Sequence, residues 1–438
     1  MLLNAKGFSK LSKEEKINFI TQNYFSNAIE AKNTLLKYWN ADEHLQNLHD
    51  EFIENTITNF YLPYGVAPNF LINNKWYTLP MVIEESSVVA AASKAAKFWS
   101  ERGGFKTSVI GVEKIGQVHF LFNGSFEKLN SFFNAIQSKF YEDTASITKN
   151  MDKRGGGILS IVLKDKTQEL PNYYQLHATF NTKDSMGANF INSCLEQFAK
   201  TLEKEAFSNE DFSSEEKNIQ IIMSILSNYV PNCLVKAEVS CLVNILSDDK
   251  NISSDEFAQK FITAINIAQI EPYRAVTHNK GIMNGIDAVV LATGNDFRAI
   301  EAGAHAYASK NGTYKSLSYA SLENNIFTFG IELPLAVGTV GGLTALHPLV
   351  KFSLQLLGNP NAETLMQIIA AAGLAQNFAA VKSLTTTGIQ KGHMKMHLMN
   401  ILNQHHATKE EKQKVLDYFK DTTLSHSLVV DYLENLRK

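Results

Sequence analysis

The order of apolar and polar residues predicts helices near the start of the chain and strands soon after. Residues 9–37 have apolar positions at helical spacing, and Ser12 followed three residues later by Glu15 is typical of a capping box. Residues 54–82 are rich in β-forming residues separated by Pro, Gly and Asn turns. Helical spacing returns over 87–99, which predicts a further helix there.

The next part of the chain, 107–183, predicts a small α+β unit. Four short apolar runs have the pattern of strands, and the stretch FEKLNSFFNAIQSKF among them has helical period. This β-α-β-β order suits a small antiparallel sheet with helices on one face. Asp184 is expected to cap the helix that follows, and the charged, Ser-rich stretch 203–217 is expected to be a loop or hinge.

The last part alternates again between the two patterns. Residues 255–310 predict a helix, a turn, a strand at AVVLATG (288–294) and an Ala-rich helix. Residues 311–348 resemble a β-hairpin that ends in the glycine-rich stretch GTVGG. A long Ala/Leu helix follows Pro360, Gly388 breaks its pattern, and the last 50 residues form a smaller, more polar helical segment.

The composition is that of a globular protein. The chain has 438 residues, 45% of them apolar, and 41 basic against 44 acidic residues give a net charge of −3. This length suggests two or three domains, and the charge argues against a nucleic-acid surface built on bulk charge. The three cysteines form no CxxC pair, and no run approaches the ~18 apolar residues of a membrane span. We therefore expect a soluble, cytoplasmic protein with neither a nucleic-acid nor a membrane partner.

The segment Glu84–Ser87 is the first candidate for chemistry. It lies at a predicted strand-to-helix junction, where free backbone N–H groups favour an anionic or polar ligand. A carboxyl group flanked by Ile83 and Val88 could be desolvated and kept protonated for acid catalysis. The alternative is that the two glutamates simply complement the dipole of the following helix.

Two further candidates follow in the second half of the chain. Residues 274–285 place Arg, His, Lys and two Asn in a predicted loop with glycines. Arg suits a carboxylate, and Lys suits a developing oxyanion; the alternative is a plain surface loop. Thr293–Asp296 comes directly after the apolar run AVVLA (288–292) of the predicted strand, where α/β folds bind ligands, although Asp296 could equally be a helix N-cap.

Glycine-containing turns and a histidine pair complete the candidates. Asp184–Asn189 combines a cap, a glycine and a helix start, which is an anion-binding arrangement, and it is not a GxGxxG motif. Gly155–Gly157 could approach a phosphate or be a flexible turn. His393 and His397 have metal-ligand spacing, but no third ligand type follows, so proton transfer by one histidine or two surface histidines are the better interpretations.

Taken in this order, the segments resemble the class II 3-hydroxy-3-methylglutaryl-CoA (HMG-CoA) reductases over most of the chain, from Gly7 to about Leu398. The matching pieces are ENTITNFYLPYGVAPNF, PMVIEESSVVAAASKAAK, DSMGANFIN, PYRAVTHNKGIMNGIDAVVLATGNDFRAIEAGAHAYAS, ELPLAVGTVGG, HPLVKFSLQLLG, GLAQN and GIQKGHM. One departure is Ser86, where many members have Pro.

The resemblance implies an α+β fold in three parts. Residues 1–109 and 233–387 would form a large mixed helix/sheet domain with a central helix, which binds HMG-CoA. Residues 110–232 would form an inserted, small ferredoxin-like domain that binds NAD(P). Residues 388–438 would form a C-terminal helical flap.

It also implies the reaction and its residues. Two successive hydride transfers from NAD(P)H would convert HMG-CoA to mevalonate and free CoA, in the mevalonate pathway of isoprenoid biosynthesis. Glu85 would supply a proton, Lys280 would stabilise the alkoxide, Asp296 would tune both, and His393 would protonate the CoA thiolate. The substrate-binding positions would be Ser87, Arg274, Asn284 and Gln376, and the cofactor-binding positions Asp184, Met186, Gly187, Ala188 and Asn189; no metal is implied.

The family also implies a homodimer with shared active sites, and a hexamer built from such dimers is the larger assembly that the resemblance allows. The basic residues Lys149, Lys153 and Arg154 favour NADPH slightly, with NADH possible. Two alternatives stay open at this point. One is the same chemistry in the catabolic direction, a mevalonate:NAD oxidoreductase; the other is a catalytically silent acyl-CoA-binding homologue.

Overall fold

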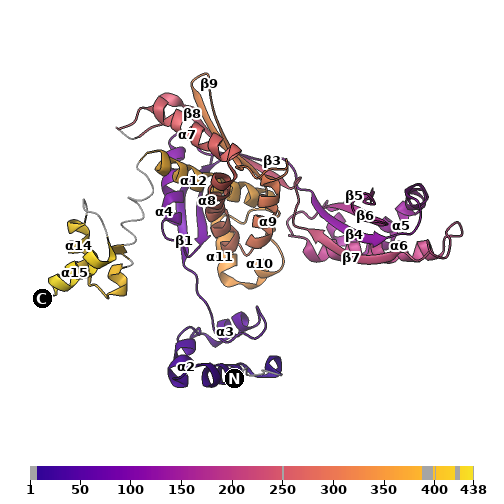
Figure 1. Cartoon of the computed structure of the whole chain (residues 1–438), viewed down its shortest axis with the longest axis horizontal. Coiled ribbons are helices and arrows are strands. Elements are labelled where there is room, and N and C mark those ends of the chain that lie inside the picture. Colours follow the sequence, from indigo (N-terminus) through magenta and orange to yellow (C-terminus); the bar gives the residue numbers. More distant parts are fainter. Residues whose placement is uncertain (1–6, 249–250, 387–397, 400, 420–424, 438) are drawn as a thin grey trace. The chain divides into compact units, whose positions relative to one another are not determined.

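The computed structural model describes residues 7–248, 251–386, 398–399, 401–419 and 425–437. It divides into two compact units, Met1–Pro63 and Tyr64–Lys438 (Figure 1). The first unit contains helices only among its described residues, as the spacing over 9–37 predicts, and Ser12 and Glu15 form the predicted capping box. Its elements are η1 (Phe8–Lys10), α1 (Lys13–Tyr24), α2 (Ala28–Leu36) and α3 (Glu43–Asp50).

The largest apolar core of the second unit surrounds the helix α12 (Ala362–Thr385). Its apolar residues face several elements at once, because it packs against three helices, α4 (Val88–Ser100), α7 (Ser254–Ile270) and α8 (Pro272–Ala292), and against a four-stranded sheet. That sheet has the order β3-β8-β10-β9. Its strands are β3 (Lys106–Val109), β8 (Leu234–Leu242), β9 (Ser318–Glu323) and β10 (Ile326–Pro334), so the hairpin predicted within 311–348 is confirmed.

Helix α12 is also long and apolar enough to cross a membrane, judged by length and composition alone, the one such helix in the described part of the chain. However, 78% of its most apolar window is buried inside the protein. A helix that is apolar on every side and enclosed by other elements is typical of a protein core. We therefore interpret α12 as the central helix of this core.

The remaining elements of this core bring the candidate site residues to its surface. The antiparallel pair β1–β2 leads through a short turn into α4, as the change of pattern after residue 82 predicts. These elements are β1 (Tyr64–Ile72), β2 (Lys75–Val82), η2 (Val243–Ile245), α7 (Ser254–Ile270), α9 (Phe297–Ala308), α10 (Leu343–Leu346) and α11 (Pro348–Leu356).

A second apolar core belongs to an inserted βαββαβ unit with the sheet order β5-β6-β4-β7. This order, with all neighbours antiparallel, is the ferredoxin-like arrangement that the family resemblance implies. Alternate residues of β6, such as Leu176 and Phe180, are buried against the two helices. The elements are β4 (Lys114–Leu121), α5 (Phe126–Asp152), β5 (Gly157–Asp165), β6 (Tyr173–Asn181), α6 (Ala188–Phe207) and β7 (Gln220–Ser227).

Two predictions about residues 274–294 are wrong. The predicted loop 274–285 and most of the predicted strand 288–294 belong to the single helix α8. Only the last two residues of the predicted strand, Thr293 and Gly294, lie beyond the end of this helix. A short apolar run cannot by itself distinguish a buried strand from a buried helix. Gly281 and Gly285 suggested a loop, but they lie within the helix, where Gly285 allows a close contact with α12.

The structure also places two smaller features differently from the prediction. The N-cap of α6 is Gly187 rather than Asp184, and α6 extends to Phe207, so only the later part of the predicted hinge 203–217 lies outside it. The last 50 residues are helical in their described parts, with α14 (Lys409–Tyr418) and α15 (His426–Leu436) sharing a small apolar cluster. The predicted break at Gly388 lies outside the described residues.

Candidate active site

The most prominent polar contact of the candidate site joins Glu85 to Lys280. Nζ of Lys280 donates a hydrogen bond to Oε2 of Glu85 at 2.7 Å. Glu85 lies in the turn between β2 and α4, and Lys280 lies on α8, so two elements distant in sequence create the pair. The side chains are 41% and 61% exposed, respectively, so the desolvation expected for this carboxyl is not present within one chain.

Ser87 follows in the same turn and has an unusual backbone. Its φ angle of 71° lies in the left-handed region, which a residue other than glycine rarely adopts. Such a conformation costs about 1–3 kcal/mol and is maintained only when the surrounding structure requires it. Here the left-handed backbone of Ser87, the N-cap, allows the chain to turn from β2 into α4 within a few residues of Glu85.

Helix α8 carries Lys280 and is held firmly against α12. A Cβ atom added at Gly285 would lie 2.6 Å from the carbonyl oxygen of Ala372 and 2.8 Å from Cβ of Gln376. Asn284 lies one turn after Lys280 on α8, and Gln376 is buried where the two helices meet. Oε1 of Gln376 has no hydrogen-bond partner among the described residues, so it is available to a ligand or a water molecule.

Arg274 is half-buried near the start of α8, and its guanidinium lies 3.5 Å from Nδ1 of His278. The other ring nitrogen, Nε2, lies 2.6 Å from Oγ of Ser318. Burial and the nearby Arg274 charge lower the pKa of His278 to about 3, so the ring is neutral. Because Arg274 can only donate, Nδ1 accepts and Nε2–H donates to Ser318. Sequence reasoning gave His278 no role, although it is part of the same segment.

Asp296 is not in contact with Glu85 or Lys280. It is the N-cap of α9, accepting from the backbone N–H groups of Arg298 and Ala299 and pairing with the Arg298 side chain at 3.1 Å. Burial works to raise the pKa of Asp296, but the hydrogen bonds from Arg298 and the backbone outweigh it and lower the pKa. The carboxyl is therefore ionised at neutral pH.

The length of α8 explains why Lys280 and Asp296 are far apart within one chain. The backbone N–H of Asn295 donates to the carbonyl of Val290. The turn that precedes Asp296 is therefore held beside the last turn of α8. Lys280 and Val290 are ten residues apart, so at 1.5 Å per residue they are about 15 Å apart along the axis. Lys280 contacts Glu85 instead, and Asp296 contacts Arg298.

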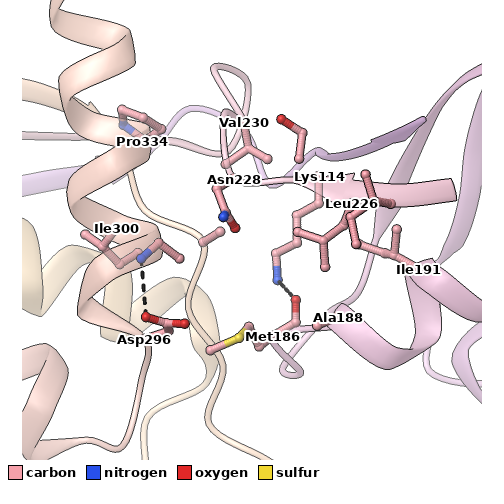
Figure 2. Close-up of a pocket in the computed structure, with 15 residues that line it drawn as sticks. Lys114, Met186, Ala188, Ile191, Leu226, Asn228, Val230, Asp296, Ile300 and Pro334 are labelled. Carbon is pink, nitrogen blue, oxygen red and sulfur yellow. Dashed lines mark hydrogen bonds between the residues drawn. The ribbon is translucent and has the colours of Figure 1, made fainter. Parts of the chain in front are cut away.

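Asp296 instead shares a pocket of about 310 Å³ with the candidate cofactor segment. Met186 and Ala188 line this pocket beside Lys114, and Figure 2 shows the Lys114 ammonium group directed at the carbonyl of Met186. A Cβ at Gly338 would lie 2.3 Å from the backbone nitrogen of Met186, so this glycine permits the close approach.

The other residues of the cofactor segment have different positions. Oδ1 of Asp184 accepts from the backbone N–H of Ala362, at the start of α12, and its carbonyl accepts from Thr339 and Val340. Gly187 has a φ angle of 88°, and a Cβ there would clash with the Thr182 side chain at 2.4 Å. Asn189 is exposed in the first turn of α6. Gly187 is therefore required by the tight turn that precedes α6.

Lys114 is the residue that sequence reasoning missed at this pocket. It is only 6% exposed, and Nζ donates to Oγ1 of Thr182 at 2.7 Å and to the carbonyls of Ser185 and Met186 at 2.9 Å each. Nothing in the motif VEKIGQ marks this lysine, because its burial depends on contacts with residues about 70 positions later in the chain.

Two candidates receive no structural description or support here. His393, and with it the pair with His397, lies outside the described residues. In the described part of the chain, no group of three or more His, Cys, Asp or Glu side chains is arranged to hold a metal ion.

Comparisons with known proteins show which family the chain belongs to. Residues 12–398 match the family model for hydroxymethylglutaryl-coenzyme A reductase. The 3-hydroxy-3-methylglutaryl-coenzyme A reductase of Archaeoglobus fulgidus is 37% identical over 437 residues, which cover 98% of this chain and 94% of that protein. The probable reductase of Borreliella burgdorferi is 35% identical over 428 residues, covering 97% and 93%.

Solved structures show the same relationship. A reductase from Streptococcus pneumoniae has a TM-score of 0.73 and 37% identity, covering 99% of this chain and 100% of that one. A class II reductase from the same organism, bound to NADPH in open conformations, has a TM-score of 0.72 and 35% identity, covering 98% and 100%. Fold and site thus define an oxidoreductase of the mixed α+β class. The chain belongs to the hydroxymethylglutaryl-coenzyme A reductase family, and the resemblance to its class II members is confirmed.

Proposed function

We propose that this protein reduces HMG-CoA to mevalonate and free CoA with two molecules of NADPH. The observation that carries the proposal is the 2.7 Å contact between Lys280 and Glu85 on an accessible surface of the HMG-CoA reductase fold. An ammonium group beside a carboxyl group provides both a cation for a developing alkoxide and a group that can transfer a proton.

The residues have separate tasks in this proposal. Nζ of Lys280 donates to the substrate carbonyl oxygen and stabilises the negative charge that develops there. The nicotinamide supplies the hydride in each of the two steps. Glu85 provides the proton when mevaldehyde becomes mevalonate, and its contact with Lys280 keeps both groups at the same substrate oxygen. His393 protonates the departing CoA thiolate, a role that rests on the family resemblance.

The substrate's carboxylate is best matched by Arg274. Arg presents a planar fork of donors for a carboxylate, and neutral His278 supports it without competing as a charge. Asn284 lies on the face of α8 that carries Lys280, and Gln376 offers a buried oxygen that accepts no hydrogen bond from the described residues. We assign these three residues and Ser87 to binding of the HMG portion.

We propose that the active form is a homodimer in which each site uses both subunits. Within one chain, Asp296 and the cofactor segment share a pocket, whereas Lys280 lies about 15 Å from the Asp296 turn along α8. The exposed face of α8 also carries Tyr273 and Val276, which are 88% and 53% exposed. A second subunit would cover this face and exclude water from the Lys280–Glu85 pair. Light scattering tests this, and a catalytically active monomer would contradict it.

We assign cofactor binding to the ferredoxin-like insertion, within the proposed boundaries 110–232, with the large domain over 1–109 and 233–387 and the flap over 388–438. The tight turn at Gly187 and the start of α6 suit an anionic dinucleotide. A Cβ at Gly155 would lie 3.6 Å from Cε of Lys183, so the basic turn that contains Arg154 lies beside the cofactor segment. These cations favour the additional phosphate of NADPH over NADH.

We place the protein in the cytoplasm. The three cysteines, Cys194, Cys233 and Cys241, are all buried and unpaired with one another. Reduced, buried thiols are typical of proteins in a reducing compartment.

The test is the loss of nicotinamide absorbance on adding HMG-CoA, with NADPH and NADH in parallel. Two cofactors consumed per CoA released are expected, and the faster cofactor indicates the direction of the pathway. Lys280→Met should lower kcat by about 10²–10³, the usual loss for one oxyanion donor. Lys97→Met, a change at an exposed lysine on α4, is the matched control. A folded wild-type dimer that binds CoA esters without turnover would instead be the silent homologue.

A further inference from the structure

Lys114 carries a positive charge into the protein interior, where the described residues that accept its hydrogen bonds are all neutral. Its three N–H donors are all used, but the acceptors are one hydroxyl and two carbonyl oxygens, all neutral. Among the residues that the structure describes, no carboxylate lies within 4.0 Å of its Nζ. A buried cation of this kind is costly unless another group compensates it, so its retention calls for a functional explanation.

The three acceptors belong to the turn that precedes α6. Oγ1 of Thr182 donates to the carbonyl of Ser185 at 2.8 Å, so Thr182, Ser185 and Met186 form one closed set around the ammonium group. Gly187 then passes so close to Thr182 that a Cβ would clash. Lys114 therefore fixes the direction in which α6 begins, and with it the backbone N–H groups of its first turn.

The charge of Lys114 also faces the pocket where a ligand would lie. Lys114 lines the 310 Å³ pocket together with Met186 and Ala188, the first residue of α6 (Figure 2). The positive end of the α6 dipole and the positive charge of Lys114 lie on the same side of the pocket, so their attractions for an anion add. Both effects favour an anion at this point, and none of the described residues provides a compensating carboxylate within 4.0 Å of Nζ.

We propose that Lys114 is a positioning residue of the cofactor site, which shapes the 182–187 turn and whose charge the phosphate groups of the bound dinucleotide neutralise. This inference rests on the proposed function, because it takes an anionic nicotinamide dinucleotide as the ligand. It assigns Lys114 no contact with the reacting atoms. The residue acts through the turn and through its charge.

The protonation of Lys114 provides a signature that a purely structural residue would lack. Burial lowers the pKa of Lys114 to about 8, so the free protein loses this charge just above neutral pH. Burial raises the pKa of the adjacent Cys233 thiol to about 11, which removes it from that range. Lys114 also lines a second pocket, of about 180 Å³. The other charged groups that line these two pockets are Asp296, Lys183, Asp184 and Glu363.

The experiment measures cofactor binding without turnover. The dissociation constants of NADPH and NADH are determined by nucleotide fluorescence between pH 6.5 and 9 for wild type, Lys114→Met and Lys164→Met. Lys164 is an exposed lysine on β5 of the same unit, so its change removes a charge without touching the turn. HMG-CoA binding by calorimetry and thermal unfolding show whether each variant is folded.

Lys114→Met is expected to weaken both nucleotides about ten- to a hundredfold at pH 7, with HMG-CoA binding and Lys164→Met unchanged. In wild type, both nucleotides should bind about tenfold more weakly at pH 9 than at pH 7, because Lys114 is about nine-tenths charged one pH unit below its pKa and about one-tenth charged one unit above it. NADH carries no additional phosphate, so a shared pH effect belongs to the protein.

Equal nucleotide affinity in wild type and Lys114→Met would overturn the proposal. If the variant does not fold, the wild-type protein decides, and nucleotide affinity that does not change with pH would overturn the proposal. A wild-type protein that binds neither nucleotide would instead overturn the proposed function.

Discussion

Two glycines on one helix provide a matched test of how tightly the candidate site is supported. Gly281 and Gly285 are one turn apart on α8, next to Lys280 and Asn284, respectively. A Cβ at Gly281 has no atom within 4 Å, whereas a Cβ at Gly285 would lie 2.6 Å from the backbone oxygen of Ala372. The same substitution to alanine should therefore have opposite effects at the two positions.

The magnitudes follow from the geometry. Replacing Gly by Ala inside a helix stabilises it by about 1 kcal/mol, which is the whole effect expected for Gly281→Ala. At Gly285 an ordinary contact needs 3.4 Å, so α8 and α12 must separate by up to 3.4 − 2.6 = 0.8 Å. Overpacking of this kind costs about 1–3 kcal/mol, and the upper end applies because a backbone carbonyl cannot rotate away. Gly285→Ala should therefore lose about 2 kcal/mol net, about 3 kcal/mol below Gly281→Ala.

The assay is urea unfolding followed by circular dichroism, with both variants and wild type at one protein concentration, because an oligomer's stability depends on concentration. The order expected is Gly281→Ala, wild type, Gly285→Ala, from most to least stable. If Gly285→Ala were as stable as Gly281→Ala, the close contact between α8 and α12 would be refuted.

Three further predictions concern other parts of the second unit. Gly338→Ala should weaken NADPH binding without weakening HMG-CoA binding, because its Cβ would lie 2.3 Å from the Met186 nitrogen; nucleotide fluorescence and calorimetry measure both. Burial and a hydrogen bond with Glu301 raise the pKa of Asp287, so its neutral form stabilises the fold at acid pH and this contribution is lost as pH rises through the raised pKa. Asp287→Asn should therefore gain stability relative to wild type between pH 5 and pH 9 in urea unfolding, and an unchanged difference would contradict this. Trp99→Ala should cost about 3–5 kcal/mol because the side chain is fully buried, a loss visible as a lower unfolding midpoint.

Much of the local structure could be read from nearby residues. The capping box of Ser12 and Glu15 involves groups three residues apart, and periodicity along each element predicted the β-α-β-β order of the inserted unit, although not its last strand β7. These features depend on short-range geometry, which is present in the sequence itself. The residue types of the candidate site were likewise visible, since Glu85, Lys280 and Arg274 stand in recognisable segments.

The structure changed how those segments are interpreted. The segment from Arg274 onward has glycines typical of a loop, yet it is helical because Gly285 packs against Ala372 on α12. Asp184 had the position of a cap for α6, but its carboxyl reaches the start of α12 instead. In each case the deciding partner lies more than 80 residues away, so no local pattern could reveal it.

The sequence by itself determined the family, the α+β class and the chemical types at the site, because these depend on the order and periodicity of residues. Only the tertiary structure decided which of these residues meet. It joined Lys280 to Glu85, separated both from Asp296 along a rigid helix, and enclosed Lys114 behind the cofactor segment. Contacts of this kind depend on how distant elements pack, and packing is a property of the folded chain rather than of any stretch of it.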